Sequence, residues 1–262
     1  PRKANAPPRT CETPAGMINA IGLANVGVEE FVRSKLPALR PYGTAIIANV
    51  FGETVEEYVE VARIASTGEG LSALELNISC PNTQRGGMVF GCDPDGTRRV
   101  VSAVRKVTSL PLIVKLTPNV TDIVSIARVA VDAGADILSL VNTFLGIAVD
   151  VARRRLVLAN GVGGVSGPAI KPQALYLVHR VCRELQVPLI GMGGMMNGND
   201  ALQFMLVGAR AIQIGTANFV DPASSVKILD GLSEALDRMG LEDVNEIVGA
   251  LKTDGPSQDF ST

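Results

Sequence analysis

The sequence lacks several features that mark common classes of protein. Its formal net charge is −2 and residues 153–155 form its one run of basic side chains, so a nucleic-acid-binding surface is not expected. Its apolar runs are short and are interrupted by glycine, proline or charged residues, so none is long enough to span a bilayer. No signal peptide is recognisable. These absences predict a cytoplasmic protein that contacts neither membrane nor nucleic acid.

Metal-binding and dinucleotide-binding motifs are also missing. The four cysteines, Cys11, Cys80, Cys92 and Cys182, include no C-x-x-C pair, which argues against a zinc site, an iron–sulfur cluster or a disulfide framework. No G-x-G-x-x-G follows the first predicted strand. The single histidine, His179, lies in a helical pattern away from every predicted strand end, so a histidine base is not expected. Any reactive thiol would therefore act alone.

The chain does carry a regular alternation of short apolar strands and amphipathic helices. Its 262 residues, 47% of them hydrophobic, suffice for one α/β domain with a full core. The alternation is typical of βα units on a parallel sheet. We predict strands at residues 44–50, 73–79, 111–117, 136–142, 187–192 and 210–215. We predict helices at residues 53–67, 95–108, 121–133, 171–186, 198–208, 222–238 and 241–252.

Polar residues follow one predicted strand after another, which favours a TIM-type (β/α)8 barrel over a doubly wound sheet. Asn49, Asn77, Lys115 and Asn142 each stand at or near the carboxyl end of a strand. Because the carboxyl ends of barrel strands share one face, these side chains would converge on one pocket. The alternative, that they are unrelated polar strand endings, stays open from the pattern alone. Six βα units are present where barrel closure needs eight.

The most distinctive of these strand ends is residues 75–82. An alternation of apolar and polar residues ends at Pro81, which has no N–H to donate to a strand ladder. The turn presents the thiol of Cys80 together with the amides of Asn77 and Asn82. These groups could act as a base and as hydrogen-bonding partners for a planar polar ligand. A strand followed by an ordinary polar loop is an equally good interpretation of the spacing.

Glycine-rich loops follow the last two predicted strands. They cover residues 191–194 and 215–218, where barrels commonly bind phosphate through backbone N–H groups and a helix N-terminus. A third such loop covers residues 163–168. One loop alone would indicate only a tight turn. The pair in this order favours a phosphate-bearing cofactor.

Seven motifs occur in series, and together they resemble one known family. They are Asn-Ala-Ile-Gly-Leu-Ala-Asn at 19–25, Asn-Ile-Ser-Cys-Pro-Asn at 77–82, Val-Lys-Leu-Thr-Pro-Asn-Val-Thr-Asp at 114–122, Val-Asn-Thr at 141–143, Ser-Gly-Pro-Ala-Ile-Lys at 166–171, Gly-Met-Gly-Gly at 191–194 and Gly-Thr-Ala-Asn at 215–218. From Pro1 to about residue 250 the chain resembles the catalytic subunit of class 1B, NAD-linked dihydroorotate dehydrogenases. The resemblance implies an FMN-containing barrel that oxidises (S)-dihydroorotate to orotate in pyrimidine biosynthesis.

The resemblance also implies roles for individual residues. Cys80 would be the base that takes the C5 proton while hydride passes from C6 to the flavin, whereas Cys92 would be non-catalytic. Lys115 would lie near flavin N1 and the C2 carbonyl, where negative charge builds on reduction. Substrate contacts would come from Asn19, Ala20, Ile21, Gly22, Leu23, Asn77, Asn82, Asn142 and Thr143. FMN would be held by Asn49, Asn77, Lys115, Val141, Gly167, Gly193, Gly194, Gly215 and Thr216.

The chain departs from the family at its beginning. Members begin with about fifty further residues, which supply the first two barrel strands. We therefore expect residues 1–262 to form a single FMN-binding barrel domain that is incomplete at its N-terminus. Its edges near residues 44–50 and 210–215 would be unpaired.

The family resemblance further implies a partner. The chain has no iron–sulfur ligand cluster, so a second subunit carrying FAD and a [2Fe–2S] cluster would pass electrons to NAD. That subunit would belong to a heterotetramer built around a homodimer of the catalytic chain. Residues 144–166 resemble a hairpin that could cover the site or meet a subunit, or that is an ordinary surface feature.

Three alternative functions stay open. A related FMN enzyme of the dihydropyrimidine dehydrogenase type shares the barrel but uses its cysteine as a proton donor. The membrane-linked class 2 dehydrogenases carry serine where Cys80 stands and have an N-terminal membrane helix that is not seen here. The third alternative is an inactive, truncated barrel without flavin.

Overall fold

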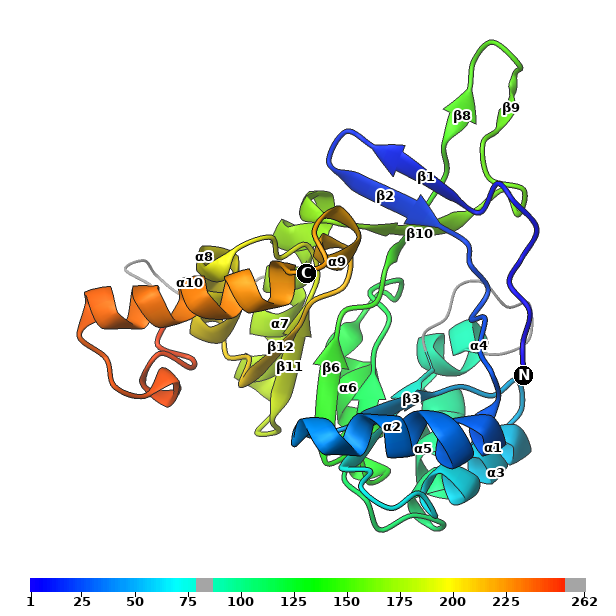
Figure 1. Cartoon of the computed structure of the whole chain (residues 1–262), viewed down its shortest axis with the longest axis horizontal. Helices are drawn as coiled ribbons and strands as arrows, with labels where there is room; N and C mark the ends of the chain where they lie inside the picture. The colour runs from blue at the N-terminus through cyan, green and yellow to red at the C-terminus, as the bar shows by residue number, and fades with distance from the viewer. Residues whose placement is uncertain (79–86, 253–262) are drawn as a thin grey trace.

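The centre of the molecule is a curled, six-stranded parallel sheet (Figure 1). The computed structural model describes residues 1–78 and 87–252. The strand order is β12-β11-β6-β5-β4-β3. The strands are β3 (Ile47–Val50), β4 (Ala73–Asn77), β5 (Leu112–Lys115), β6 (Ile137–Leu140), β11 (Leu189–Met192) and β12 (Ala211–Gln213). Each lies within a strand predicted from the sequence, so the α/β, βα-repeat prediction is confirmed.

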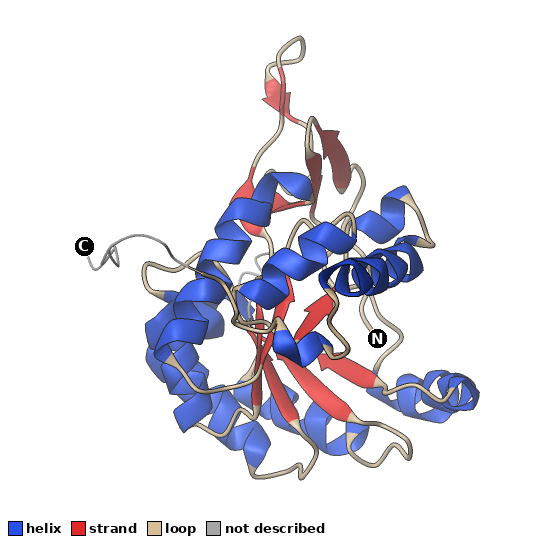
Figure 2. Cartoon of the chain, turned by 90° about the vertical axis from the view of Figure 1, so that its left-hand side faces the viewer, coloured by secondary structure: helices blue, strands red, loops and turns tan. Residues whose placement is uncertain are grey.

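Helices cover the outer face of this sheet (Figure 2). They are α3 (Val55–Ala65), α5 (Pro94–Arg105), α6 (Ile123–Asp132), α7 (Lys171–Glu184), α8 (Gly198–Leu206) and α10 (Ser224–Met239). Side chains at the starts of four of them accept backbone N–H bonds that the helix itself cannot satisfy, and these are Thr54, Asp93, Asp122 and Asn197. Six of the seven predicted helices are thus present, and their boundaries follow these caps.

The seventh predicted helix, at residues 241–252, is wrong. Gly240 ends α10 in the left-handed conformation, and a capping box between Asp243 and Glu246 starts only the short 3-10 turn η4 (Val244–Glu246). Gly249 has φ +72°, a backbone conformation that cannot continue a right-handed helix. The apolar spacing in this segment instead serves packing, because Ile247 is buried against α8 and α10 in a small cluster with Leu202 and Leu232.

Alternation along the strands separates two environments. Leu74, Leu76 and Val114 point to the outer face, where they are fully buried against helix residues such as Val104 and Ala127. Burying a leucine of this kind contributes about 2 kcal/mol. The intervening residues face the inside of the curl, and there polar side chains replace the apolar ones toward the carboxyl ends of the strands.

A second, antiparallel sheet accompanies the barrel strands. It has the order β1-β2-β10-β7 and comprises β1 (Thr10–Thr13), β2 (Gly16–Asn19), β10 (Gly163–Ser166) and β7 (Phe144–Gly146). The hairpin of β8 (Val149–Asp150) and β9 (Arg155–Leu156) projects away from the rest of the molecule (Figure 1). Residues 144–166 therefore contain the predicted hairpin, flanked by two strands that join it to the N-terminal hairpin.

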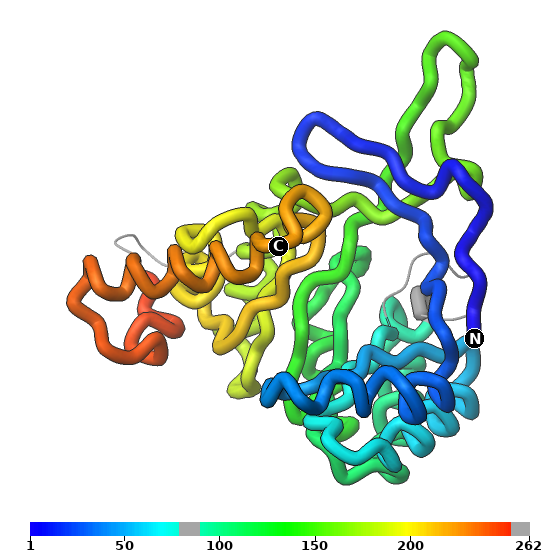
Figure 3. The backbone as a smooth tube through the Cα atoms, in the orientation of Figure 1, coloured from blue at the N-terminus to red at the C-terminus, as the bar shows by residue number. Residues whose placement is uncertain are grey.

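The N-terminal segment runs out to the β1–β2 hairpin and returns beside itself, as the tube in Figure 3 shows. Backbone bonds between Arg2 and Asn25 and from Asn5 N to Ile21 O hold the two passes together. A continuous helical stretch follows and contacts α3; it comprises α1 (Val28–Glu30), η1 (Phe31–Lys35), α2 (Leu36–Leu39) and η2 (Arg40–Tyr42). The remaining short elements are α4 (Gly87–Cys92), η3 (Pro168–Ile170) and α9 (Ala217–Val220).

The six-stranded sheet is open. In the described part of the chain β3 and β12 are its outermost strands, as the strand count predicted, and no further strand pairs with either. A hydrogen bond of 2.8 Å from Gln213 Nε2 on β12 to Glu75 Oε1 on β4 spans the inside of the curl. Among residues 1–78 and 87–252, no helix is long and apolar enough to cross a membrane.

Candidate active site

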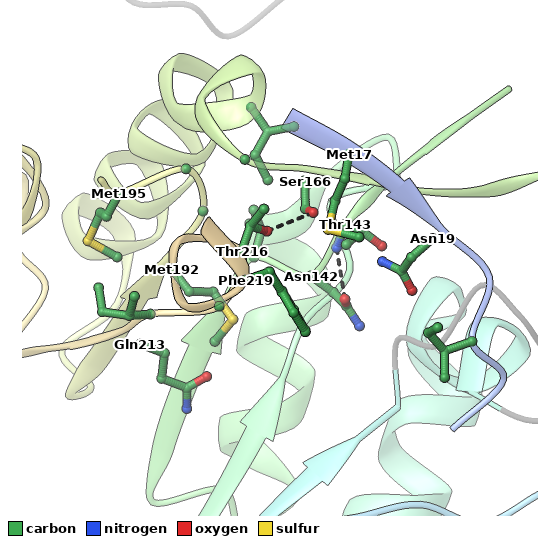
Figure 4. A pocket seen from close by; sticks show the side chains of 18 of the residues that line it. Met17, Asn19, Asn142, Thr143, Ser166, Met192, Met195, Gln213, Thr216 and Phe219 are labelled. Atoms are coloured by element: carbon green, nitrogen blue, oxygen red, sulfur yellow. Dashed lines mark hydrogen bonds between the residues drawn. The ribbon is translucent and has the colours of Figure 1, made fainter. Parts of the chain in front are cut away.

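A cavity of about 530 Å³ lies at the carboxyl ends of the barrel strands, between them and the β1-β2-β10-β7 sheet. Residues from both sheets line it, and Figure 4 shows ten of them labelled. The lining residues are Thr10, Met17, Asn19, Ile21, Lys115, Val141, Asn142, Thr143, Ser166, Gly167, Ile170, Met192, Gly193, Gly194, Met195, Gln213, Ile214, Gly215, Thr216 and Phe219. The predicted convergence of strand ends on one pocket is therefore present.

Most of the predicted site residues meet at this cavity. Eleven of them line it: Asn19, Ile21, Lys115, Val141, Asn142, Thr143, Gly167, Gly193, Gly194, Gly215 and Thr216. Five others do not line it: Ala20, Gly22, Leu23, Asn49 and Asn77. The remaining two, Cys80 and Asn82, lie outside the described residues.

The alternating direction of side chains after β2 explains why Ala20 does not line the cavity. Asn19 and Ile21 face the cavity, so Ala20 between them points the other way and is fully buried in a cluster with Ile18 and Leu158. Gly22 packs against the N-terminal segment instead, since a Cβ there would lie 2.7 Å from the Asn5 amide. The strand alternation in the sequence alone would have predicted that Ala20 faces the opposite side from Asn19 and Ile21.

Asn77 lies just behind the cavity wall. It is buried at the end of β4, and Asn142 Nδ2 donates to its Oδ1 at 3.4 Å. Its backbone carbonyl accepts a 2.8 Å bond from the hydroxyl of Tyr58 on α3. Asn142 in turn accepts the backbone N–H of Thr143 on its own Oδ1 at 2.8 Å. The Asn77 side chain thus supports a residue that does line the cavity.

Lys115 brings positive charge to the cavity. It ends β5 and stands in register between Asn77 on β4 and Ser139 on β6. Within the described ranges the lysines that form ion pairs are Lys171, with Asp200, and Lys227, with Asp221. The Lys115 ammonium therefore has no carboxylate partner among those residues, which suits it to a ligand that carries or develops negative charge.

The glycine-rich loops form a cradle of closely packed backbone that leaves little room for side chains. A Cβ on Gly194 would lie 2.6 Å from the Gly167 carbonyl oxygen, and one on Gly193 would lie 2.7 Å from the Ala174 Cβ. Gly215, by contrast, has open space where its Cβ would be. These glycines line the cavity with backbone that carries no side chain, which fits the phosphate end of a cofactor such as FMN.

Two side-chain bonds join these loops. Thr216 Oγ1 donates to Ser166 Oγ at 2.8 Å, which connects the loop after β12 to the end of β10. Lys171, at the start of α7, pairs with the buried carboxylate of Asp200, which also accepts the backbone N–H of Met196 at 2.9 Å. The cradle is therefore held by contacts from two helices, α7 and α8, and from the antiparallel sheet.

Sequence reasoning missed part of the lining. Met17, Met192 and Met195 give the cavity apolar walls, and Phe219 borders it although 82% of its surface is exposed. Gln213 was also missed. Its signal was present, because it precedes the Gly215 loop by two residues on a predicted strand, where alternate residues must face inward.

Two further titratable groups, Cys92 and His179, stand apart from the cavity. Cys92, at the end of α4, donates to the Asn119 carbonyl at 3.6 Å, and desolvation raises the pKa of its thiol. Desolvation lowers the pKa of His179 on α7, with a further lowering from Arg183. Neither lines the cavity. In the part of the chain that the structure describes, no group of three metal-ligating side chains gathers.

Fold and site together define a TIM-type α/β barrel whose last two strand loops can cradle a phosphate. A family model for dihydroorotate dehydrogenase matches residues 1–236. The catalytic subunit of dihydroorotate dehydrogenase B (NAD(+)) from Geotalea uraniireducens is 53% identical over 253 residues, which cover 97% of this chain and 83% of the relative. The same subunit from Geobacter sulfurreducens is 52% identical over 252 residues, with 96% and 83% covered.

The chain belongs to the dihydroorotate dehydrogenase family. It is thereby placed among the FMN-dependent oxidoreductases of pyrimidine biosynthesis, and the family resemblance, the TIM-type fold and the flavoprotein assignment drawn from the sequence are confirmed.

Proposed function

We propose that the protein oxidises (S)-dihydroorotate to orotate in pyrimidine biosynthesis and passes the electrons to NAD through a partner subunit. One observation carries most of the weight. Asn19, Asn142 and Thr143, predicted to contact substrate, line the same cavity as Lys115 and the glycine cradle, predicted to contact FMN. A substrate in that cavity would therefore lie against the cofactor.

The proposed substrate contacts are chemically suited to an orotate-like ring. Its edge mixes carbonyl acceptors with N–H donors, and an asparagine amide offers both complements. Asn142 is held by Asn77 and by the Thr143 backbone, so its orientation is fixed before substrate arrives. We propose that Asn19, Ile21, Asn142 and Thr143 contact the substrate directly, and Asn82 by its place in the motif. Ala20, Gly22, Leu23 and Asn77 do not line the cavity and would support these contacts from behind.

The cofactor would be FMN, which when bound supplies the hydride acceptor. Gly167, Gly193, Gly194, Gly215 and Thr216 would hold its phosphate end. Lys115 would place a positive charge beside the ring system, and Val141 would complete the contacts. Asn49 and Asn77 would support the ring from behind the cavity wall. Met192 and Met195 would exclude water from the ring.

We propose that Cys80 is the base that takes the proton from C5. This role rests on the motif, since Cys80 lies outside the described residues. A thiol with the reference pKa of about 8.5 is mostly protonated at neutral pH. Either the site favours the thiolate, or flavin reduction by dihydroorotate accelerates as the pH rises.

The proposed partner is an electron-transfer subunit carrying FAD and a [2Fe–2S] cluster, in a heterotetramer around a homodimer of this chain. The support is that the relatives are named catalytic subunits of an NAD(+)-dependent enzyme. We propose further that residues 1–262 act as one FMN-binding domain and that the protein works in the cytoplasm.

The test is anaerobic reduction of the FMN-loaded chain. Dihydroorotate should bleach the visible flavin absorbance, and dihydrouracil should not; bleaching by dihydrouracil alone would instead favour an enzyme of the dihydropyrimidine dehydrogenase type. Cys80→Ala should retain the flavin and slow its reduction by about 10² to 10⁴-fold. Cys92→Ala is the matched control and should reduce at the wild-type rate. A chain that takes up no flavin would identify an inactive barrel.

A further inference from the structure

A buried carboxylate lies below the cavity, in a part of the fold to which the proposed mechanism gives no role. Glu75 stands in the middle of β4 and is only 4% exposed. Its neighbours Leu74 and Leu76 fill the outer core, so its own side chain faces the inside of the curl. A carboxylate this deeply buried is stable only if several donors replace the water it has lost.

Three donors from three different strands supply that replacement. Ser139 on β6 donates to Oε1 at 2.7 Å, and Gln213 Nε2 on β12 donates to the same oxygen at 2.8 Å. Asn49 on β3 donates its amide nitrogen to Oε2. The Glu75 carboxylate therefore gathers side chains from both outermost strands of the half-barrel and from one between them.

This arrangement fixes which way two amides face. Both amides donate their nitrogens to carboxyl oxygens of Glu75, so each turns its own carbonyl oxygen away from Glu75. Gln213 lines the cavity, and Figure 4 shows its oxygen on the side of the other labelled residues and its nitrogen on the far side. The floor of the cavity consequently offers a hydrogen-bond acceptor rather than a donor.

We propose that Glu75 is a positioning residue which holds Gln213 and Asn49 by their amide nitrogens and so keeps a carbonyl acceptor turned toward an N–H of the cofactor's ring. This inference rests on the proposed function, because it takes FMN as the ligand. Oxidised FMN has a single ring N–H, at N3. The Gln213 acceptor distinguishes that N–H from an alkylated or unprotonated nitrogen.

The experiment compares two probes, FMN and FMN methylated at N3, titrated by fluorescence into the full chain freed of flavin. The wild type should bind FMN at least about fivefold more tightly than the methylated probe, since one hydrogen bond is at stake. Glu75→Met removes both acceptor oxygens, so nothing holds the Gln213 amide nitrogen away from the ligand. FMN affinity should then fall about five- to tenfold, while affinity for the methylated probe stays the same.

Two further variants separate positioning from a merely structural role. Ser139→Ala removes a donor from the same carboxylate and leaves both amides in place, so discrimination between the probes should survive. In the double variant Glu75→Gln with Gln213→Glu, the amide at position 75 donates to the carboxylate at position 213. The second carboxylate oxygen then faces the cavity as an acceptor, so discrimination between the two probes should be present. If Glu75 served only the stability of the fold, Ser139→Ala would also weaken FMN binding, and the double variant would not restore discrimination between the probes.

The outcomes divide clearly. Equal binding of the two probes by the wild type, or a folded Glu75→Met variant that still discriminates, overturns the inference and leaves the proposed function standing. No binding of FMN by the wild type overturns both. If Glu75→Met does not fold, Gln213→Met tests the same acceptor, and its loss of discrimination supports the inference whereas retention overturns it.

Discussion

Asn119 holds Thr143 in place: its Nδ2 donates to the Thr143 backbone carbonyl at 2.9 Å. The same side chain accepts the Leu145 N–H on its Oδ1 at 3.0 Å and bonds Thr117 Oγ1 at 3.0 Å. One amide therefore ties the loop after β5 to the loop after β6. Thr143 lines the cavity, so Asn119 acts on the proposed substrate site without lining it.

Asn119→Ala should weaken substrate binding at Thr143 and leave the FMN content of the protein unchanged. Losing two bonds to the loop after β6, each worth about 1 kcal/mol, should raise the KM for dihydroorotate by roughly tenfold while FMN stays bound. Steady-state kinetics and flavin content measure the two effects. Asn160→Ala, at an exposed position near the projecting hairpin, is the control and should match the wild type. An unchanged KM for Asn119→Ala would show that Thr143 needs no such support.

The two kinds of glycine in the cradle should respond differently to alanine. At Gly194 the φ of +76° and the nearby Gly167 carbonyl oppose any Cβ, so Gly194→Ala should lower both stability and FMN affinity. At Gly215 a Cβ meets no protein atom within 4 Å, so Gly215→Ala should leave the flavin-free protein as stable as the wild type. Because Gly215 lines the cavity, the new methyl group should still weaken FMN.

Thermal unfolding without flavin, followed by FMN titration, checks this pair. Gly231→Ala serves as the control, since its Cβ would make only ordinary contact with Gly198 on α8. Normal FMN affinity in Gly215→Ala would place the phosphate elsewhere in the cavity.

Cys92 should react slowly at neutral pH. Desolvation raises the pKa of its thiol in the folded protein, so at any pH below that pKa a smaller share is thiolate than in an unfolded chain. Its alkylation by iodoacetamide should therefore lag behind that of the unfolded chain and accelerate only as the pH is raised toward the shifted pKa. Mass spectrometry of the Cys92 peptide over a pH series measures this. Alkylation at the unfolded rate near pH 7 would make Cys92 a rival to Cys80.

The sequence sufficed for the βα framework because its signals are local. Each barrel strand is a short apolar run, and helix starts such as Asp122 are marked by a capping residue. The helix expected at 241–252 failed for a local reason too, since Gly249 adopts a positive φ that its apolar neighbours do not reveal.

The antiparallel sheet could not be predicted in this way. It depends on β2 pairing with β10, with Asn19 opposite Gly164, and nothing in either four-residue strand specifies a partner so far along the chain. Glu75 illustrates a second limit. As a polar residue alternating with leucines it resembles a solvent-facing position. The curl of the sheet buries it and brings the donors of three other strands within hydrogen-bond distance.

The Lys171–Asp200 pair should matter more to stability than an exposed pair of the same chemistry. Asp200 is nearly buried, with 8% of its side chain exposed, and it also fixes the Met196 N–H beside the cradle. Lys171→Met would leave that carboxylate buried without its cation, which should lower the free energy of unfolding by about 2 to 3 kcal/mol. The loss is moderate because a quarter of the lysine side chain is exposed to water. Adding Asp200→Asn should recover part of the loss, because the uncompensated charge is removed.

Lys227→Met is the matched control, since the Lys227–Asp221 pair lies at the surface and water replaces it easily. Urea denaturation of the flavin-free variants measures all four proteins, and the denaturant dependence should be the same in each. FMN titration of the folded variants adds a second readout: Lys171→Met should bind FMN more weakly, because Asp200, which accepts the Met196 N–H of the loop, loses the cation that holds its carboxylate in place. Equal stability of Lys171→Met and Lys227→Met would mean that water reaches Asp200 and that its carboxylate does not depend on the pair.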